Sequence, residues 1–365
     1  MDFYWDDETK KYTVGSNLYS KEEFLDLINT DMLQTFLDKK EKGVSSISSS
    51  SGSSNVIVGA ENVLIYGLPG VGKSYYIKQN YCSNEDQIQR VVFHPEYSYS
   101  DFVGQVMPRL VKSTLPDGTE RNIVDYVFSE GPFSKIMHKA INDPLNMYYL
   151  IIEEINRGDA PAIFGELFQL LDRVDDKSLS NYGESEYGVS NFDLGSYLYK
   201  DPNVLIKIPS NLTVLATMNT ADQNVFTLDT AFQRRWQFKC IPNDIDNSTY
   251  ANSIIEHTSI KWGCFAKTIN ELIINQNSAN SLKSSDKRLG AYFVKNSDLT
   301  VERFAEKVLK YLWDDVFKSS KEVIFSQNCK TLDQVIISYK TSTDDSLKSV
   351  LNSGVYETML NLSNN

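Results

Sequence analysis

The sequence predicts an α/β core with a parallel sheet, followed by a helical region. Five short apolar runs alternate with segments able to form helices, a pattern typical of a parallel sheet covered on both faces. These runs occupy residues 63–66, 90–94, 147–152, 212–218 and 236–241. A glycine-rich loop follows the first run, and strand signals end at Pro242. We therefore expect a five-stranded α/β core over 55–241 and a helical lid with a C-terminal tail over 242–365.

The loop after the first run has the sequence of a phosphate-binding P-loop, G-x-x-x-x-G-K-S. It reads Gly67-Leu68-Pro69-Gly70-Val71-Gly72-Lys73-Ser74. Glycines let the backbone approach a phosphate closely, and successive N–H groups at a helix start make an anion cradle. Lys73 is expected to reach the β- and γ-phosphates, and Ser74 to offer its hydroxyl to Mg²⁺. The alternative is a turn with a chance lysine, and the strand before the loop favours nucleotide binding instead.

The run at 147–152 carries a second motif, because it ends in Glu153 and Glu154. Hydrophobic residues followed by two acids match a Walker B element, and ligands of open parallel sheets bind beyond the carboxyl ends of the strands. We expect Glu153 to hold Mg²⁺, partly through water, since Mg²⁺ keeps several of its waters. Glu154 would polarise the attacking water as a general base. The alternative, a solvent-facing acidic strand end, weakens once a P-loop is present.

Three further polar residues are candidates for the same site. Asn219 ends the fourth run, where it would orient the attacking water or contact the γ-phosphate. Arg234 and Arg235 stand just before the last run. They are either a surface pair or arginine fingers, which reach the nucleotide of a neighbouring subunit.

Outside the core strands, the pattern predicts several other segments. Residues 1–44 form a short helical element, with helical spacing over 24–37, and the serine-rich stretch 45–54 is a linker. The polar insertion 175–209 should hold a turn and hairpin arm near 200–208. Further helices are expected at 161–172, 252–257, 264–275, 301–318, 333–339 and 348–362.

Composition limits the classes of function. The 365 residues carry a formal net charge of −12, so no broad basic face for nucleic acid is implied. No apolar run is long enough to span a membrane, and the acidic N-terminus lacks the basic start of a signal peptide. The four cysteines are far apart in the sequence, which favours free thiols in a reducing cytoplasm.

The motifs together resemble an AAA+ ring ATPase and, more narrowly, the McrB family, the motor subunits of modification-dependent restriction systems. The resemblance covers roughly residues 55–318. It is carried by F-H-P-E-Y-S-Y-S-D-F-V-G at 93–104, I-E-E-I-N-R-G at 152–158, F-G-E-L at 164–167 and M-N-T-A-D at 218–222. The run L-G-A-Y-F at 289–293 is similar to the family's I-G-H-S-Y-F lid motif, with Ala291 a departure.

The resemblance implies a hexameric ring with nucleotide between subunits. Asn219 would be sensor 1, and Arg234 and Arg235 the trans-acting fingers. It implies ATP or GTP with Mg²⁺ as cofactors, and an McrC-like subunit carrying the nuclease. The acid Glu153 replaces the usual Walker B aspartate. The region before the core is too short for a DNA-reading domain, so DNA is expected to be contacted through the complex rather than by this chain alone.

Two other functions compete with a restriction motor. One is a MoxR-like AAA+ ATPase that remodels protein complexes without a DNA role, and the other is a nucleotide-gated scaffold without turnover. Intact Lys73 and Glu154 argue against the scaffold. A nuclease site in this chain is disfavoured, because the acids near Pro116 lack the expected lysine and the stretch reads as a Pro-Asp-Gly turn.

Overall fold

The computed structural model describes residues 3–6, 11–14, 17–19, 57–114, 120–220, 226–280 and 287–364. The chain divides into two units, Met1–Ser54 and Asn55–Asn365, and each is described by itself. The expected helix over 24–37, the linker 45–54 and the Pro-Asp-Gly turn at 116–118 lie outside the described residues.

The described part of the first unit is an antiparallel sheet, whereas the sequence pattern predicted a helical element over residues 1–44. Its strands are β1 (Phe3–Asp6), β2 (Lys11–Val14) and β3 (Asn17–Tyr19), in that order. Trp5 pairs with Tyr12, and Tyr12 pairs in turn with Tyr19. Aromatic side chains favour strands and stabilise them through cross-strand pairs, which explains why these residues form a sheet.

The second unit is built on the predicted five-stranded sheet, and all four strand pairings are parallel. In sheet order the strands are β10 (Gln237–Cys240), β4 (Asn62–Gly67), β9 (Leu212–Asn219), β8 (Tyr148–Glu153) and β5 (Ile88–Val92). Each strand coincides with one of the five apolar runs, shifted by two residues at most in sequence. The predicted fold class is therefore confirmed.

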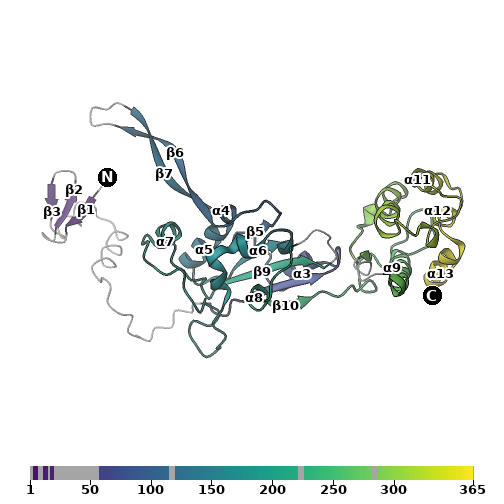
Figure 1. Ribbon diagram of the computed structural model, residues 1–365, viewed down its shortest axis with the longest axis horizontal. Helices are drawn as coiled ribbons and strands as arrows, with labels where there is room; N and C mark the ends of the chain where they lie inside the picture. The colour runs from purple at the N-terminus through teal and green to yellow at the C-terminus, as the bar shows by residue number, and fades with distance from the viewer. Residues whose placement is uncertain are drawn as a thin grey trace. The chain divides into compact units, whose positions relative to one another are not determined.

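Helices cover both faces of this sheet (Figure 1). On one face α3 (Lys73–Asn80) packs Ile77 with Val63 and Ile65 of β4. The opposite face is covered by α4 (Tyr99–Phe102), α5 (Pro132–Asn142), α6 (Ala160–Phe164), α7 (Phe192–Tyr199) and α8 (Thr230–Gln233). Because apolar residues face both layers, the central strands read as continuous apolar runs rather than as alternating ones.

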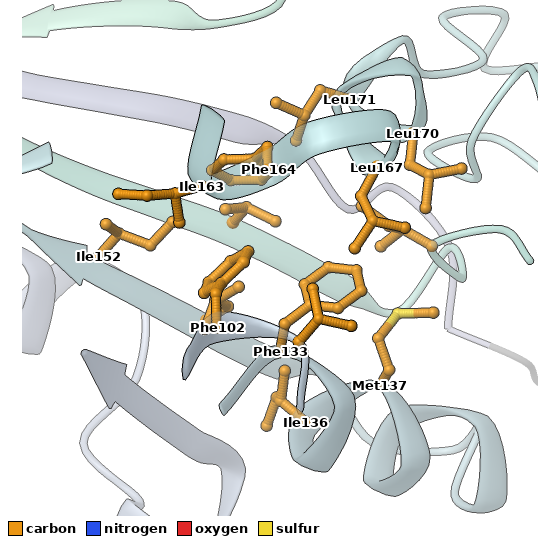
Figure 2. Packing of buried hydrophobic residues seen from close by; sticks show 14 of the residues in the cluster. Phe102, Phe133, Ile136, Met137, Ile152, Ile163, Phe164, Leu167, Leu170 and Leu171 are labelled. Atoms are coloured by element: carbon orange, nitrogen blue, oxygen red, sulfur yellow. The ribbon is translucent and has the colours of Figure 1, made fainter. Parts of the chain in front are cut away.

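Aromatic rings fill the larger of these two layers (Figure 2). The ring of Phe102 lies 5.3 Å from that of Phe133 and 4.9 Å from that of Phe164, centroid to centroid. Such tilted pairs add to the stabilisation from burial. The layer fixes α4, α5 and α6 on the sheet and so sets the position of the loops at its edge.

The helix expected over 161–172 is broken in two. After α6 the chain continues as a 3-10 helix, Gly165–Leu171, and Gly165 has a φ of 53°. A Cβ at Gly165 would lie 3.0 Å from the ring of Tyr99. Glycine is needed both for the left-handed backbone and for this close approach.

A long antiparallel hairpin interrupts the core between α4 and α5. Its strands are β6 (Gly104–Thr114) and β7 (Glu120–Glu130), and it extends away from the sheet (Figure 1). Leu110, Val124 and Tyr126 on it are largely exposed. The hairpin was not predicted, because apolar residues occur on both of its faces and its strands therefore lack a clean alternation.

The insertion 175–209 is packed on the core rather than extended as the expected hairpin arm. It carries α7, and isolated antiparallel bridges join Arg173 to Ser185 and Val189 to Ile206. Leu194 and Leu198 of α7 are buried in the main aromatic layer. Two apolar residues four positions apart form one helix face.

The C-terminal region is helical, as predicted, with its own core. Its helices are α9 (Trp262–Asn280), α10 (Val301–Phe304, continuing as π-helical turns Ala305–Leu309 and Leu312–Val316), α11 (Leu332–Thr341), α12 (Ser346–Val350) and α13 (Ser353–Asn364). Residues 252–257 are not a helix, since Ile254 pairs with Lys261 in a bridge and His257 has a φ of 57°. Within the described ranges, every helix is too short or too polar to cross a lipid bilayer.

Candidate functional site

The predicted nucleotide-binding residues meet at the carboxyl edge of the sheet. Gly67, at the end of β4, pairs in register with Asn219, at the end of β9. Glu153 ends the neighbouring strand β8, and Glu154 follows it. Three central strands therefore deliver the P-loop, the Walker B acids and the strand-terminal asparagine to one place.

The P-loop backbone has the shape that a phosphate cradle requires. Gly70 and Gly72 have φ values of 75° and 96°, and α3 begins directly afterwards at Lys73. L-residues with a side chain rarely adopt such values. The donors of a helix N-terminus are thereby open to an anion, so these residues fit the phosphates of a nucleotide.

Lys73 is buried beneath this loop, with 9% of its surface exposed. Its Nζ donates to the carbonyl oxygens of Gly67 and Leu68, each at 3.1 Å, and to Oδ1 of Asn219. These three acceptors are neutral. A buried ammonium in such surroundings attracts an anion strongly, because the local dielectric constant is low.

Asn219 connects the P-loop lysine to the Walker B acid. Its Oδ1 accepts from Lys73, and its Nδ2 donates to both carboxylate oxygens of Glu154, at 2.6 and 2.8 Å. A carboxamide carries both an acceptor and a donor, so it can face a cation on one side and an anion on the other without changing its protonation state. Lys73 and Glu154 are thus connected through the one amide of Asn219.

The backbone at Glu154 is strained, with φ 55° and ψ 46°. Its N–H donates to Oγ1 of Thr217 at 3.2 Å, which helps to hold the left-handed conformation. Arg157 Nε lies 3.4 Å from Oε2 of Glu154. Strained residues of this kind concentrate at functional sites, where neighbouring contacts fix a side chain in one direction.

Glu153 and Ser74 are the residues expected to supply oxygen ligands to Mg²⁺. Glu153 lies on the same face of the sheet as α3, and its Oε1 accepts from Arg90 Nη1 at 2.7 Å. Ser74 is exposed on the first turn of α3. A carboxylate and a hydroxyl beside a phosphate cradle are a donor set that Mg²⁺ favours. The residues present therefore fit a nucleotide with its magnesium ion.

Asn156 is buried beside Asn219 and forms a hydrogen bond with its backbone. It is 3% exposed, and its Nδ2 donates to the backbone oxygen of Asn219 at 3.1 Å. Its own backbone oxygen accepts from the N–H of Phe226 at 2.8 Å. The same side chain thus joins the turn after β8 to the end of β9.

The two arginines lie at the opposite, amino edge and differ from each other. Arg235 donates from Nε and Nη2 to Asp172 Oδ2, at 3.0 and 2.7 Å, and its guanidinium carbon lies 3.9 Å from the centre of the Phe168 ring. Its side chain is 7% exposed. Arg234 is exposed. The structure thus holds Arg235 against residues of its own chain and leaves Arg234 at the surface.

Arg173 fixes the same edge. It donates to Asn62 Oδ1 and to the backbone oxygens of Gly183 and Leu212, at 2.9 to 3.0 Å. Burial lowers the pKa of its guanidinium to about 9, which still leaves the group charged at neutral pH. Asn62 in turn donates to the backbone oxygen of Arg235 at 3.1 Å. Hydrogen bonds through Asn62 thus connect Arg173 to the backbone of Arg235 at this edge of the sheet.

The motif analysis named residues that the structure brings together at this edge, and it missed their partners. Asn156 and Arg157 stand within the I-E-E-I-N-R-G run, so their proximity to Glu154 was a usable signal. Thr217 lies two residues before Asn219 on the same strand face, another usable signal. Arg90 gave none, since it reaches Glu153 only through the pairing of β5 with β8.

Residues 62–236 match the model of the AAA domain (dynein-related subfamily). Component YdiS of the type II restriction enzyme BsuMI from Bacillus subtilis (strain 168) is 35% identical over 308 residues, 77% of this chain and 86% of that protein. The EcoKMcrB subunit of a type IV methyl-directed restriction enzyme from Escherichia coli (strain K12) is 28% identical over 200 residues, 53% of this chain and 38% of that one. A solved structure of a candidate ATPase from Cytophaga hutchinsonii covers 89% of both chains at 12% identity, with a TM-score of 0.30.

Proposed function

The chain belongs to the McrB-like AAA+ ATPases of restriction systems, and from this premise we propose that it is the ring motor of a restriction or phage-defence complex. In this role it hydrolyses ATP or GTP and either drives DNA translocation or activates a partner nuclease. One observation carries the hydrolytic part of the proposal, namely the hydrogen-bonded series Lys73–Asn219–Glu154 beside the P-loop.

Each residue of this series has a role in hydrolysis. The P-loop N–H groups and Lys73 bind the phosphates, and Glu154 accepts the proton of the attacking water. Asn219 orients that water and the γ-phosphate relative to Glu154. Ser74 and Glu153 would hold Mg²⁺, which when bound neutralises charge on the β- and γ-phosphate oxygens.

The ring completes the site with a group from the next subunit. We assign this role to Arg234, because it is exposed beside α8 while Arg235 is fixed by Asp172 and Phe168. An arginine finger stabilises charge on the transferring phosphoryl group. A hexamer with nucleotide at each interface, as in the resemblance, places such a finger in trans.

An McrC-like subunit carrying the nuclease is the proposed partner. The net charge of −12 argues against broad DNA binding by this chain alone, so DNA is contacted through the complex. Both curated relatives are components of restriction enzymes, which supports this role over the remodelling of protein complexes.

Lys73→Ala tests the nucleotide site. We expect loss of measurable ATP and GTP binding, because the site loses its buried cation, while the exposed Lys78→Ala on the same helix binds as the wild type does. Binding is measured by calorimetry, and turnover of each triphosphate is measured with and without the product of a neighbouring nuclease gene. Tight binding by Lys73→Ala would rule out the P-loop assignment. Turnover that responds to protein complexes but never to a nuclease subunit would favour a MoxR-like role.

A further inference from the structure

The hairpin β6–β7, which extends away from the sheet (Figure 1), exposes large apolar side chains. Leu110 is 75% exposed, Tyr126 71% and Val124 57%. Three more apolar side chains on it are 41 to 44% exposed, namely Val106, Met107 and Ile123. Single exposed apolar residues are normal in soluble proteins, whereas a contiguous set of them marks a site of interaction.

The register of the two strands sorts these residues onto two faces. Directly opposite residues of an antiparallel pair share a face, and so do residues two positions apart along one strand. One face, here called face A, carries the successive cross-strand pairs Val106–Phe128, Pro108–Tyr126 and Leu110–Val124. None of these residues is charged, so face A is a continuous apolar strip.

The opposite face of the ribbon, here called face B, is also largely apolar. Its pairs over the same stretch are Met107–Val127, Arg109–Asp125 and Val111–Ile123. The two charged residues have opposite signs and stand directly opposite each other, so this stretch of face B carries no net charge. Both faces can therefore be buried without leaving a charge of one sign uncompensated.

The base of the hairpin is fixed to the core. The ring of Phe128 lies 5.2 Å from that of Tyr197 in α7, centroid to centroid. A Cβ at Gly131, directly after β7, would lie 2.3 Å from the backbone oxygen of Phe102. The core therefore sets the direction in which the ribbon leaves it. Among the described residues, no third strand pairs with β6 or β7.

The size of each face limits what can cover it. Strands of 11 residues are about 36 Å long and a pair of strands is about 10 Å wide, so each face offers about 350 Å². A stable complex buries about 800 Å² on each partner. Whatever covers the ribbon must therefore be held to this chain by a second interface as well.

Two apolar faces on one ribbon require two neighbours. A single partner protein on one face would leave the other face exposed. In a ring, each subunit contacts its two neighbours through two different surfaces, so copies of one chain supply a neighbour for each face. The remaining ring interfaces provide the second attachment that a face of this size needs.

We propose that face A of each hairpin packs on face B of the hairpin of the next subunit. The inference rests on the proposed ring assembly and adds a contact between its subunits. Cyclic symmetry places every ribbon at the same height, so residues at one level of face A meet residues at the same level of face B. Packed sheets are about 10 Å apart, which requires the hairpins to converge on one side of the ring.

Sedimentation velocity on the full-length protein tests this contact, with a non-hydrolysable ATP or GTP analogue and Mg²⁺ present. Leu110→Glu places a charge on face A, and Ile123→Lys places one on face B at the adjacent level. Each variant alone should raise the protein concentration for half-maximal assembly by about 10- to 100-fold, as for one aliphatic side chain lost from an interface. Ile337→Glu, at an exposed residue of α11, is the control and should assemble as the wild type does.

Combining both changes in one chain identifies which faces meet. If face A meets face B of the next subunit, each contact in the double variant brings the introduced carboxylate near the introduced ammonium group. The double variant should therefore recover most of the assembly that either single change loses. If face A meets face A, carboxylates repel each other and no recovery occurs, which would overturn the proposed contact.

Calorimetry with the same analogue separates this inference from the proposed function. Every variant should bind the analogue as the wild type does, because none of the changed residues belongs to the P-loop. Wild-type protein that binds the analogue but stays monomeric would overturn the ring assembly itself. Wild-type assembly by both single variants would overturn the hairpin contact alone. If those variants also lose stimulation by a nuclease subunit, the hairpin belongs to that partner instead.

Discussion

The two edges of the central sheet use charged residues in opposite ways. At the carboxyl edge, Lys73 and Glu154 share one neutral mediator, Asn219, and each can exchange that hydrogen bond for one to a ligand. At the amino edge, Arg235 and Arg173 are enclosed by fixed partners within the subunit. The difference separates charged residues that hold the fold from those that are available for chemistry, a distinction that residue type alone does not reveal.

The first prediction concerns Arg234, the exposed member of the arginine pair. Arg234→Ala should lower turnover by about 10³- to 10⁵-fold while leaving nucleotide affinity per subunit almost unchanged, as for loss of an arginine finger. Steady-state turnover and calorimetry on the same preparation measure both. Retained turnover would show that Arg234 takes no part in the chemistry.

Mixing two inactive variants tests whether Arg234 acts on the nucleotide of a neighbouring subunit. One variant, Arg234→Ala, keeps a working pocket, and the other, Lys73→Ala, keeps a working arginine. In mixed rings some intact pockets face intact arginines, so part of the activity should return. If the mixture stays inactive although native mass spectrometry detects mixed rings, Arg234 acts within its own subunit.

The second prediction concerns the two acids at the carboxyl edge, Glu153 and Glu154. Glu154→Gln keeps the shape of the side chain and loses its basicity, so turnover should fall by about 10²- to 10⁴-fold with nucleotide binding intact. The matched variant Glu153→Gln should instead raise the Mg²⁺ concentration required for half-maximal binding of nucleotide. If Glu153→Gln stops turnover and Glu154→Gln does not, the roles of the two acids are reversed.

The third prediction concerns Arg235, whose role is expected to be structural. Arg235→Ala removes a mostly buried ion pair and a ring contact, and should lower the free energy of unfolding by about 2 kcal/mol. Urea denaturation followed by circular dichroism measures the change, and the Asp172→Ala variant and the double variant complete a cycle. Loss of turnover with unchanged stability would identify Arg235 as a catalytic residue after all.

The smallest expected effect is at Thr217. Thr217→Val removes the acceptor for the N–H of Glu154 and should cost about 1 kcal/mol of stability, because that N–H is left without a partner. Thr217→Ser keeps the hydroxyl and serves as control. Thermal unfolding of the two variants is compared, and equal melting temperatures would show that the strained backbone at Glu154 is held by other contacts.

The sequence predicted features that depend on neighbouring residues in the chain, and it missed contacts between residues that are far apart in the chain. The five strands were found because each is a local apolar run, and Lys73, Glu154 and Asn219 because they stand in or directly after recognisable motifs. The Arg90–Glu153 and Arg235–Asp172 pairs were not foreseen, since 63 residues separate the members of each. Spacing in the chain carries no information about which strands become neighbours.

Turn and hairpin geometry was the other source of error. The break at Gly165 depends on the position of Tyr99, which a helical pattern over 161–172 does not contain. The hairpin β6–β7 escaped notice because apolar residues occur on both of its faces, so its strands lack a clean alternation.

That hairpin has a consequence for the solution behaviour of a single subunit. It is a two-stranded ribbon whose outer edges have no neighbouring strand within the described residues, and it exposes Leu110, Val124 and Tyr126. Open edges with apolar side chains template pairing between molecules, so the concentration at which isolated subunits begin to aggregate should be set here. Pro108 removes one backbone donor from β6, and Arg109 interrupts the apolar surface. We expect these two residues to limit such pairing between molecules.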